Sequence, residues 1–312
     1  MRNILVTGGF GGIGRHVVRN LMANEDNAVT VFDLKNRVNQ EVARDSIFAG
    51  DKIKILWGDI TRPDTYPDVS EFDAIVHMAY IIPPASENLP RYITEKVNVE
   101  GTCNFIKHAE ECNFGGKFIF ASSVSLFGPT MTRTTLVTAD DPINPTDVYT
   151  SQKARCEEYL QSTSLKWLIL RISGAMNLKQ DLSPSNLEML YRIPYDQRFE
   201  FIHPMDAALA FSNAVYTDAE REVLIIAGGE KCRLEYNKMI EGLLGVFNIP
   251  TPDRSKFTTR AYYLDYYDTT RSQELLKYQT RNFNDFLDDF EENLSVGGKM
   301  VRFFGPIAKF FV

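Results

Sequence analysis

The sequence predicts an α/β protein built on a doubly wound parallel sheet, with a smaller lobe formed by the C-terminal part of the chain. Three observations lead to this prediction. A glycine-rich turn joins the first apolar run to a helix-like segment. Short apolar runs then alternate with helix-like segments, as in a parallel sheet covered on both faces. Beyond Arg171 this alternation becomes irregular, and Pro184 and Pro194 interrupt it.

The glycine-rich turn lies in the stretch Asn3 to Gly14, which reads NILVTGGFGGIG. Its apolar run predicts a strand, and the spacing Gly8-x-x-Gly11-x-x-Gly14 is followed by residues that suit a helix. A strand, a tight glycine turn and a helix N-terminus together bind the pyrophosphate of a dinucleotide in Rossmann-type folds. The alternative is a glycine turn that only joins a strand to a helix.

An acidic residue supports the dinucleotide interpretation. The second apolar run, Ala28 to Phe32, ends in Asp33, 19 residues after Gly14. A carboxylate at this place accepts hydrogen bonds from the hydroxyls of the adenosine ribose and repels a 2′-phosphate. The sequence therefore favours NAD over NADP, although Lys35 and Arg37 are close enough in the chain to leave NADP open.

The remaining elements follow in order along the chain. A short helix is expected within 36–50. Further strands are expected at 52–57, 73–79, 117–121, 165–170, 199–203 and 223–227. The expected helices are 92–112, 147–160, 206–215, 234–247, 269–276 and 283–293, and a proline-rich loop is expected at 81–90. These assignments rest on apolar periodicity and on the positions of proline and glycine.

The residues at the ends of the strands predict where a ligand binds. Ligands of doubly wound sheets bind beyond the carboxyl ends of the strands. We therefore expect the residues just after the strands to surround a single cleft. These residues are Thr7, Asp33, Asp59, Ala79, Ser122 and Arg171.

The composition is that of a globular protein with a sizeable core. The 312 residues are 44% hydrophobic and 24% charged, and the net charge of −7 argues against a nucleic-acid-binding surface. The four cysteines show no C-x-x-C spacing and there are only four histidines, so we expect reduced thiols and no metal site. We find no signal peptide and no apolar run of about 20 residues, which predicts a cytoplasmic protein.

The strongest chemical signal is the segment Tyr149-Thr150-Ser151-Gln152-Lys153. Residues four apart lie on the same face of a helix, so the ammonium group of Lys153 can lie near the hydroxyl of Tyr149. The ammonium and a cationic nicotinamide ring would favour the phenolate, whose ordinary pKa is ~10. The alternative is a core tyrosine and a surface lysine. Ser122 and Ser123, at the end of an expected strand, offer a hydroxyl for the same substrate oxygen.

Together these segments resemble the extended short-chain dehydrogenase/reductase family, in its NAD-dependent epimerase/dehydratase branch. The resemblance covers nearly the whole chain. The motifs that carry it are T-G-x-x-G-x-x-G at 7–14, the acidic Asp33, G-D-I at 58–60, H-x-A at 77–79, S-S-x-x-x-F-G at 122–128, Y-x-x-x-K at 149–153 and F-I-H-P-M-D at 201–206.

The resemblance implies roles for individual residues. Tyr149 would be the general acid/base, Lys153 would bind the nicotinamide ribose, and Ser123 would be the catalytic hydroxyl. Ser125 would place a second hydroxyl near the substrate. The implied cofactor-binding residues are Gly8, Phe10, Gly11, Gly12, Ile13, Gly14, Asp33, Asp59, Ile60, Met78, Ala79, Tyr80, Asn98, Tyr149 and Lys153. His77 is expected either to line the cofactor site or to lie in the core. His203 is expected to be structural.

The resemblance also implies a division of the chain. Residues 1–171 would form the NAD-binding domain of Rossmann type and carry the catalytic residues. Residues 172–296 would form mainly the substrate-binding lobe, with segments returning to the core sheet. Residues 297–312 would form an amphipathic tail, which predicts either a peripheral membrane contact or, as we prefer, a cap or a dimer contact. We expect a homodimer.

The predicted substrate is a small molecule with a secondary alcohol or a ketone. Family members that dehydrate sugar nucleotides usually carry Asp-Glu after the catalytic hydroxyl, where this chain has Val124-Ser125, so a 4,6-dehydratase is disfavoured. The segment after Arg171 matches the nucleotide-holding stretch of the epimerases poorly. Arg192 and Arg198 are the candidates for binding a diphosphate.

The resulting hypothesis is an NAD-dependent oxidoreductase or epimerase that acts on the secondary hydroxyl of a nucleotide sugar or a related substrate. The first alternative is a net alcohol dehydrogenase or ketone reductase with a smaller or more apolar, hydroxysteroid-like substrate. The second alternative is a non-catalytic NAD-binding regulatory protein. The complete Ser-Tyr-Lys set argues against this last alternative, because a protein that only binds NAD does not need it.

Overall fold

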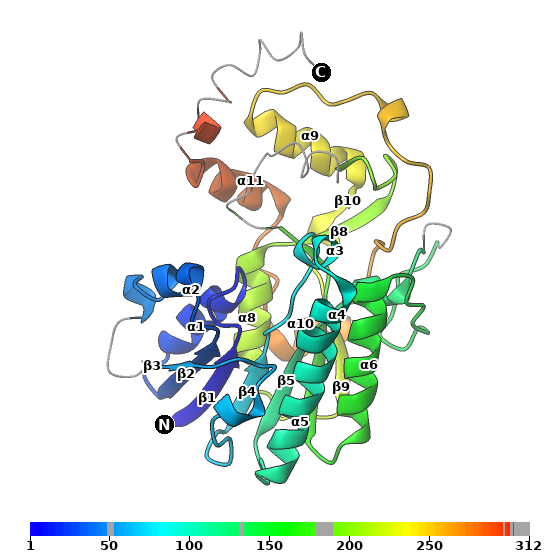
Figure 1. The fold of residues 1–312 in the computed structure, drawn as a ribbon. Helices are drawn as coiled ribbons and strands as arrows, with labels where there is room; N and C mark the ends of the chain where they lie inside the picture. Colours follow the sequence, from blue (N-terminus) through cyan, green and yellow to red (C-terminus); the bar gives the residue numbers. More distant parts are fainter. Residues whose placement is uncertain are drawn as a thin grey trace.

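The centre of the computed structural model is a seven-stranded parallel sheet (Figure 1). The structure describes residues 1–48, 53–130, 134–176, 178, 190–295, 297–299 and 302. The strand order is β3-β2-β1-β4-β5-β6-β9. The strands are β1 (Arg2–Thr7), β2 (Asn27–Asp33), β3 (Ile53–Trp57), β4 (Ala74–His77), β5 (Lys117–Ser123), β6 (Lys166–Ile172) and β9 (Glu222–Ile226). The order reverses between β1 and β4, which confirms the predicted doubly wound sheet and places its ligand crevice at the ends of these two strands.

Alternate residues of each strand face opposite layers of helices. In β1, Ile4 and Val6 join one buried cluster and Leu5 joins the other. The first cluster is covered by α1 (Gly14–Met22), α8 (Pro204–Ala214) and α10 (Thr270–Leu276). The second is covered by α5 (Thr102–Glu111) and α6 (Val148–Ser162). Apolar residues on both faces of the strands explain the almost continuous apolar runs in the sequence.

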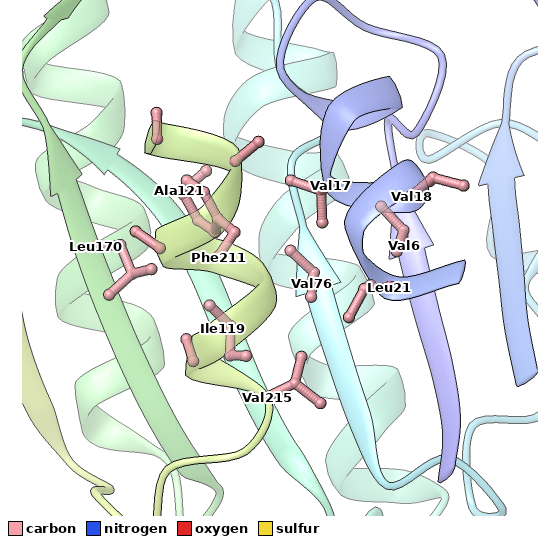
Figure 2. Close-up of a cluster of buried hydrophobic side chains, with 14 of the residues drawn as sticks. Val6, Val17, Val18, Leu21, Val76, Ile119, Ala121, Leu170, Phe211 and Val215 are labelled. Carbon is pink, nitrogen blue, oxygen red and sulfur yellow. The ribbon is translucent and has the colours of Figure 1, made fainter. Parts of the chain in front are cut away.

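The layer of α1 and α8 fixes the helix that follows the glycine turn. Figure 2 shows side chains of both helices directed at the strands, among them Val17, Leu21 and Phe211. All three are completely buried. Because α1 is held by this cluster, the N-terminus of α1 has a fixed position at the carboxyl edge of the sheet.

A smaller unit lies beyond the carboxyl ends of the strands (Figure 1). It contains a three-stranded sheet of β10 (Arg233–Glu235), β8 (Arg198–Ile202) and β7 (Gly174–Ala175), together with α9 (Tyr236–Val246) and α11 (Phe283–Glu292). Its separate buried cluster is rich in phenylalanine. The segments α8, β9 and α10 also follow residue 171, but they pack in the large parallel core.

The shorter elements are mostly single turns. They are α2 (Arg37–Val42), α3 (Ala85–Asn88), α4 (Arg91–Thr94), a π-helical segment at Glu95–Gly101 and 3-10 turns at Ser46–Phe48, Pro63–Thr65, Val124–Phe127, Glu230–Cys232 and Arg254–Lys256. Within the described ranges, no helix has both the length and the apolar character needed to cross a bilayer. Most of the predicted tail, 297–312, lies outside the described residues, so its role stays a prediction.

Three predicted elements differ from the structure. The helix expected at 92–112 is divided into α4, the π-helical segment and α5. The helix expected at 234–247 begins only at Tyr236, because Arg233–Glu235 pairs as a strand with β8. The loop expected at 81–90 contains the one-turn helix α3. The pairing with β8 is a contact with a distant segment, and periodicity alone does not report such contacts.

The buried cluster between α1 and α8 gives a prediction for stability. Phe211 is completely buried, so Phe211→Ala should lower the free energy of unfolding by about 3–5 kcal/mol through lost burial and the cavity left behind. Urea unfolding followed by circular dichroism measures this change. Val38→Ala is the matched control, because Val38 is 67% exposed and its loss should change stability by less than about 0.5 kcal/mol. Equal effects of the two substitutions would contradict the packing described for α8.

Candidate active site

The glycine turn lets two parts of the backbone approach each other at the crevice. Gly8 has a φ of +69°, and a Cβ atom there would lie 2.7 Å from the backbone nitrogen of Ala79. A Cβ atom at Gly14 would meet the carbonyl oxygen of Gly8. The backbone N–H of Gly11 donates to that same oxygen over 3.0 Å. The turn therefore has no room for side chains at 8 and 14, and α1 begins at the crevice, where its N-terminus favours an anion.

A cavity of about 220 Å³ runs from this turn to the end of β2. Pockets for complete drug-sized ligands usually measure ~300–1,000 Å³, so this cavity suits the adenosine half of a dinucleotide. Its lining residues are Gly8, Gly11, Phe32, Asp33, Leu34, Asn39, Gly58, Ile60, Met78, Ala79, Tyr80, Ile81 and Val97. No lysine or arginine is among the described residues that line it.

Asp33 is held in place by three protein donors. Its Oδ2 accepts a hydrogen bond from the backbone N–H of Phe10 (3.1 Å), and its Oδ1 accepts from the backbone N–H of Leu34 (2.8 Å) and from Nδ2 of Asn39 (3.1 Å). Burial raises the pKa of this carboxyl, and the three hydrogen bonds oppose that effect. A carboxylate fixed in this way suits the two hydroxyls of an adenosine ribose and disfavours a 2′-phosphate.

The two nearby cations do not reach the cavity. Arg37 forms an exposed ion pair with Glu41 one turn later (3.0 Å), and Lys35 is exposed. Neither residue lines the cavity. The residues present therefore fit NAD better than NADP.

The structure brings only part of the predicted cofactor set to the cavity. The predicted residues that line it are Gly8, Gly11, Asp33, Ile60, Met78, Ala79 and Tyr80. Sequence reasoning missed Phe32, Leu34, Asn39, Gly58, Ile81 and Val97. Asn39 could have been found as a polar residue on the short helix that follows Asp33, and Gly58 as the first residue of the G-D-I motif. The other four are apolar, and no sequence signal distinguishes them from core residues.

The side chain of Phe10 lies outside the cavity. Its ring packs against Phe48 and Trp57, with centroid distances of 4.9 and 5.3 Å, and the side chain is buried away from the cavity. Only its backbone N–H takes part, through the hydrogen bond to Asp33. Gly12 is exposed in the turn, and Ile13 packs against the core cluster of α1. Neither lines the cavity, nor does Gly14.

Asn98 and Asp59 are engaged within the protein. Asn98 is completely buried in the π-helical segment, where its side chain accepts from the N–H of Ile81 (2.7 Å) and donates to the carbonyl oxygen of Ile81 (3.0 Å). It therefore positions the cavity wall and does not line the cavity itself. Asp59 Oδ1 accepts from both the N–H and the hydroxyl of Thr61, at 2.8 Å each. The predicted contact of Asp59 with adenine stays a prediction.

His77 lies in the core and does not line the cofactor cavity. Its Nδ1 lies 2.9 Å from Oγ1 of Thr7, and its Nε2 lies 3.2 Å from Oγ1 of Thr102. Burial, and secondarily the charge of Lys153, lowers the pKa of His77 to about 3, so the ring is neutral. His203 is also completely buried, where its Nδ1 accepts from the N–H of Met205 at the start of α8. Both histidines have structural positions.

Tyr149 and Ser123 meet at the carboxyl edge of the sheet. Ser123 ends β5, and its Oγ lies 2.7 Å from Oγ of Ser125. Tyr149 lies in the first turn of α6, which Asp147 and Thr150 cap reciprocally. Burial raises the pKa of Tyr149 to about 12, and a hydrogen bond with Ser123 opposes this rise. The predicted serine and tyrosine are thus in contact.

Lys153 lies one turn further along α6 and is buried. Its Nζ donates a hydrogen bond to the carbonyl oxygen of Ala121. The ring centroid of Tyr80 lies 3.4 Å from Nζ, and that of Phe120 lies 4.6 Å from it. Burial lowers the pKa of Lys153 to about 7, and the charge of Glu157 opposes the shift. The sequence motif placed Lys153 near Tyr149, but it did not indicate the aromatic rings around the ammonium.

Two residues expected in the cleft point elsewhere. Ser122 and Arg171 are both buried beneath α6, where they bond the carboxylate of Glu157. The Arg171–Glu157 pair has an N–O distance of 2.7 Å. The prediction of a single ring of residues is wrong here because the pleat turns Ser122 and Arg171 toward the same face as Phe120.

Thr7, also expected at the cleft, is completely buried. Its Oγ1 accepts hydrogen bonds from the backbone N–H groups of Met78 and Ala79, at 3.2 Å each. Thr7 therefore joins the ends of β1 and β4 and contributes to the site only through the backbone that it holds.

The two candidate arginines already have carboxylate partners. Arg192 pairs with Glu87 at 3.0 Å, and both side chains are exposed. Arg198 pairs with the buried Asp265 at 2.9 Å, and its guanidinium lies 4.4 Å from the ring centroid of Tyr266. The structure does not bring these two arginines together at a free cationic site.

The sequence is similar to that of several known enzymes. It is 28% identical over 186 residues to the decarboxylating sterol-4-alpha-carboxylate 3-dehydrogenase of Candida albicans, covering 56% of this chain and 51% of that protein. It is 29% identical over 181 residues to UDP-glucose 4-epimerase 2 of Oryza sativa subsp. japonica, covering 54% and 43% respectively. The matches thus span about half the length of these two curated relatives.

A solved structure shows the same fold over almost the whole chain. The UDP-glucuronic acid 4-epimerase of Bacillus cereus, in complex with UDP-glucuronic acid and NAD, superposes with a TM-score of 0.77. It is 19% identical, and the match covers 93% of this chain and 98% of that one. The likeness therefore supports the fold, including the smaller unit beyond the sheet.

The family profile decides the assignment. Residues 4–176 match the NAD dependent epimerase/dehydratase family, which is more than half of the chain and includes the glycine turn, Asp33, Ser123, Tyr149 and Lys153. The cavity geometry at the glycine turn and Asp33 agrees with this match. The chain belongs to the NAD dependent epimerase/dehydratase family, and NAD is its cofactor.

Proposed function

We propose that the chain catalyses hydride transfer at a secondary hydroxyl, with Tyr149 as the general acid/base and Ser123 and Lys153 as its partners. The observation that supports this proposal is that Tyr149 bonds Ser123 and that Tyr149 and Lys153 both contact Tyr80, a residue of the cavity lining. Tyr80 lines the cavity and also contacts Lys153 and Tyr149, so the catalytic set adjoins the cofactor site. A protein that only bound NAD would not need this set.

Each residue has a task that follows from its position. NAD supplies the hydride acceptor. The hydroxyl of Ser123, in contact with Tyr149, can hold the substrate oxygen by a hydrogen bond. Tyr149 removes the hydroxyl proton as a phenolate and returns it in the reverse direction. The hydrogen bond with Ser123 opposes the pKa increase that burial causes in Tyr149. The Lys153 ammonium, one turn further along the helix, would favour the phenolate as well.

The ion pairs of Arg192 and Arg198 with carboxylates favour the net dehydrogenase over the nucleotide-sugar epimerase. A diphosphate would have to separate Arg198 from Asp265, whose side chain is completely buried. Removing the partner of a buried carboxylate is costly. Among the described residues, the other candidate, Arg192, is held by Glu87. We therefore favour an uncharged or apolar secondary alcohol, with the nucleotide-sugar epimerase as the second candidate.

Replacing the proposed base tests the mechanism. Tyr149→Phe removes only the hydroxyl and should lower kcat by at least about 100-fold, because general acid–base catalysis typically supplies 10²–10⁴-fold. NAD affinity, measured by calorimetry, should change little. Tyr92→Phe is the control, because Tyr92 is 72% exposed and lies outside the catalytic set. Near-normal turnover by Tyr149→Phe would disprove the acid/base role.

The cofactor preference follows from Asp33. NAD should bind at least about tenfold more tightly than NADP, because a 2′-phosphate next to this carboxylate brings like charges together. Titration of the protein with both cofactors measures the ratio. Asp33→Ser should reduce the preference, whereas Glu41→Ser, at an exposed ion pair outside the cavity, should preserve it. Tighter binding of NADP by the unaltered protein would contradict this account of Asp33.

A substrate panel separates the two candidates. The protein is incubated with NAD and with nucleotide sugars, hydroxysteroids or simple secondary alcohols, and absorbance at the NADH band is followed. A net dehydrogenase accumulates NADH, whereas an epimerase converts its substrate without net reduction of the cofactor. We expect NADH to accumulate with a neutral alcohol. Epimer formation from a nucleotide sugar without net NADH would instead support the second candidate.

A further inference from the structure

Tyr80 lies where the cofactor cavity meets the catalytic set. Its side chain lines the cavity together with Gly8 and Asp33. Its ring centroid lies 3.4 Å from Nζ of Lys153. The ring is also nearly perpendicular to that of Tyr149, at 85° with a centroid distance of 6.0 Å. One aromatic side chain from the end of β4 therefore contacts both of the α6 residues that the proposed chemistry uses.

The ammonium of Lys153 depends on these aromatic contacts. Lys153 is buried, and no ion pair in the described part of the chain includes it. Its neighbours are the carbonyl oxygen of Ala121 and the faces of Tyr80 and Phe120. The titratable groups whose charges act on Lys153 are Cys156 and Glu157. The carboxylate of Glu157 is already bonded to Ser122 and Arg171. A buried cation in such surroundings gains most from a ring at short distance, and Tyr80 is the closer of the two rings.

The backbone on both sides of Tyr80 is fixed. The N–H of Ala79 donates to Oγ1 of Thr7 over 3.2 Å. The N–H and the carbonyl oxygen of Ile81 bond the side chain of the buried Asn98, at 2.7 and 3.0 Å. With both neighbours anchored, the backbone of Tyr80 has little freedom to move away from Lys153. Thr7 and Asn98 therefore both hold the backbone next to Tyr80.

We propose that Tyr80 is a positioning residue that holds the Lys153 ammonium against its ring face and packs on Tyr149, thereby fixing the lysine and the tyrosine relative to each other. This inference rests on the proposed function of Tyr149 and Lys153. It assigns to Tyr80 a second role besides lining the cofactor cavity. The phenol oxygen of Tyr80 is not needed for it, because the contact with Lys153 is made by the ring.

The proposal predicts how a loss of the ring affects the pH profile. Without the ring, the ammonium of Lys153 is less stable in its buried site, so Lys153 loses its proton at a lower pH. The phenolate of Tyr149 then lacks the neighbouring positive charge, and its formation requires a higher pH. In the direction of alcohol oxidation, which needs the phenolate, the acidic limb of kcat/KM should therefore move to higher pH.

The kinetic test compares Tyr80→Leu with Tyr80→Phe. Tyr80→Leu should lower kcat/KM by about tenfold and move the acidic limb up by about one pH unit, because a neighbouring opposite charge shifts the pKa of a titrating group by ~1–3 units. Tyr80→Phe retains the ring and should keep the acidic limb unmoved. Tyr92→Leu, at an exposed position outside the site, is the matched control. An unmoved limb in Tyr80→Leu would overturn the proposal.

A second test needs neither cofactor nor substrate. Tyr80→Leu and Lys153→Met are combined in a double-mutant cycle, and urea unfolding of the cofactor-free proteins is measured at pH 6, where Lys153 is charged. The ratio of folded to unfolded protein should depart from additivity by about tenfold. Additive effects would overturn the contact between Tyr80 and Lys153. Non-additive effects without turnover of any substrate would support that contact and refute the proposed function, so the two failures are distinguishable.

Discussion

The close approach of the backbone at Gly8 and Ala79 determines how the rest of the site is built. No side chain fits between these two residues, and the hydroxyl of Thr7 ties the ends of β1 and β4 together at the same level. The floor of the cavity is therefore backbone, which a ligand can approach closely. The same contact places Tyr80 immediately after β4, at the border between the cavity and the catalytic set.

Most of the fold could be predicted from the sequence, because its signals are local. The glycine spacing, the apolar runs and Asp33 each depend on a few neighbouring residues, and the parallel sheet agrees with them. The pairing of Ser122 and Arg171 with Glu157 could not be predicted, because the motifs do not indicate this partner in α6. The ring of Phe10 likewise turns toward Phe48 and Trp57, two residues remote in sequence. The direction of a side chain depends on the residue that it contacts, and a sequence motif does not identify that residue.

The smaller unit beyond the sheet uses its cations to stabilise its own buried carboxylates. Glu200 is completely buried in β8 and accepts hydrogen bonds from the N–H groups of Gly229 and Tyr267, at 2.9 Å each, and from Arg233. Arg198, on the same strand, is paired with Asp265. A sequence shows only that arginines are present. Their pairing determines whether they are available to an anionic substrate, and here it directs the proposed function toward uncharged alcohols.

The π-helical segment Glu95–Gly101 makes this region sensitive to chain length. A π-helical turn holds one residue more than an α-helical turn, and here it carries the Asn98 that anchors Ile81. Deleting one residue from the segment would restore the regular helix and remove the widened turn that carries Asn98. The position of the Asn98 amide relative to Ile81 would then change, even though every residue type at the site was unchanged. Related chains that differ by a single-residue gap here are thus expected to hold the wall of the cavity by other means.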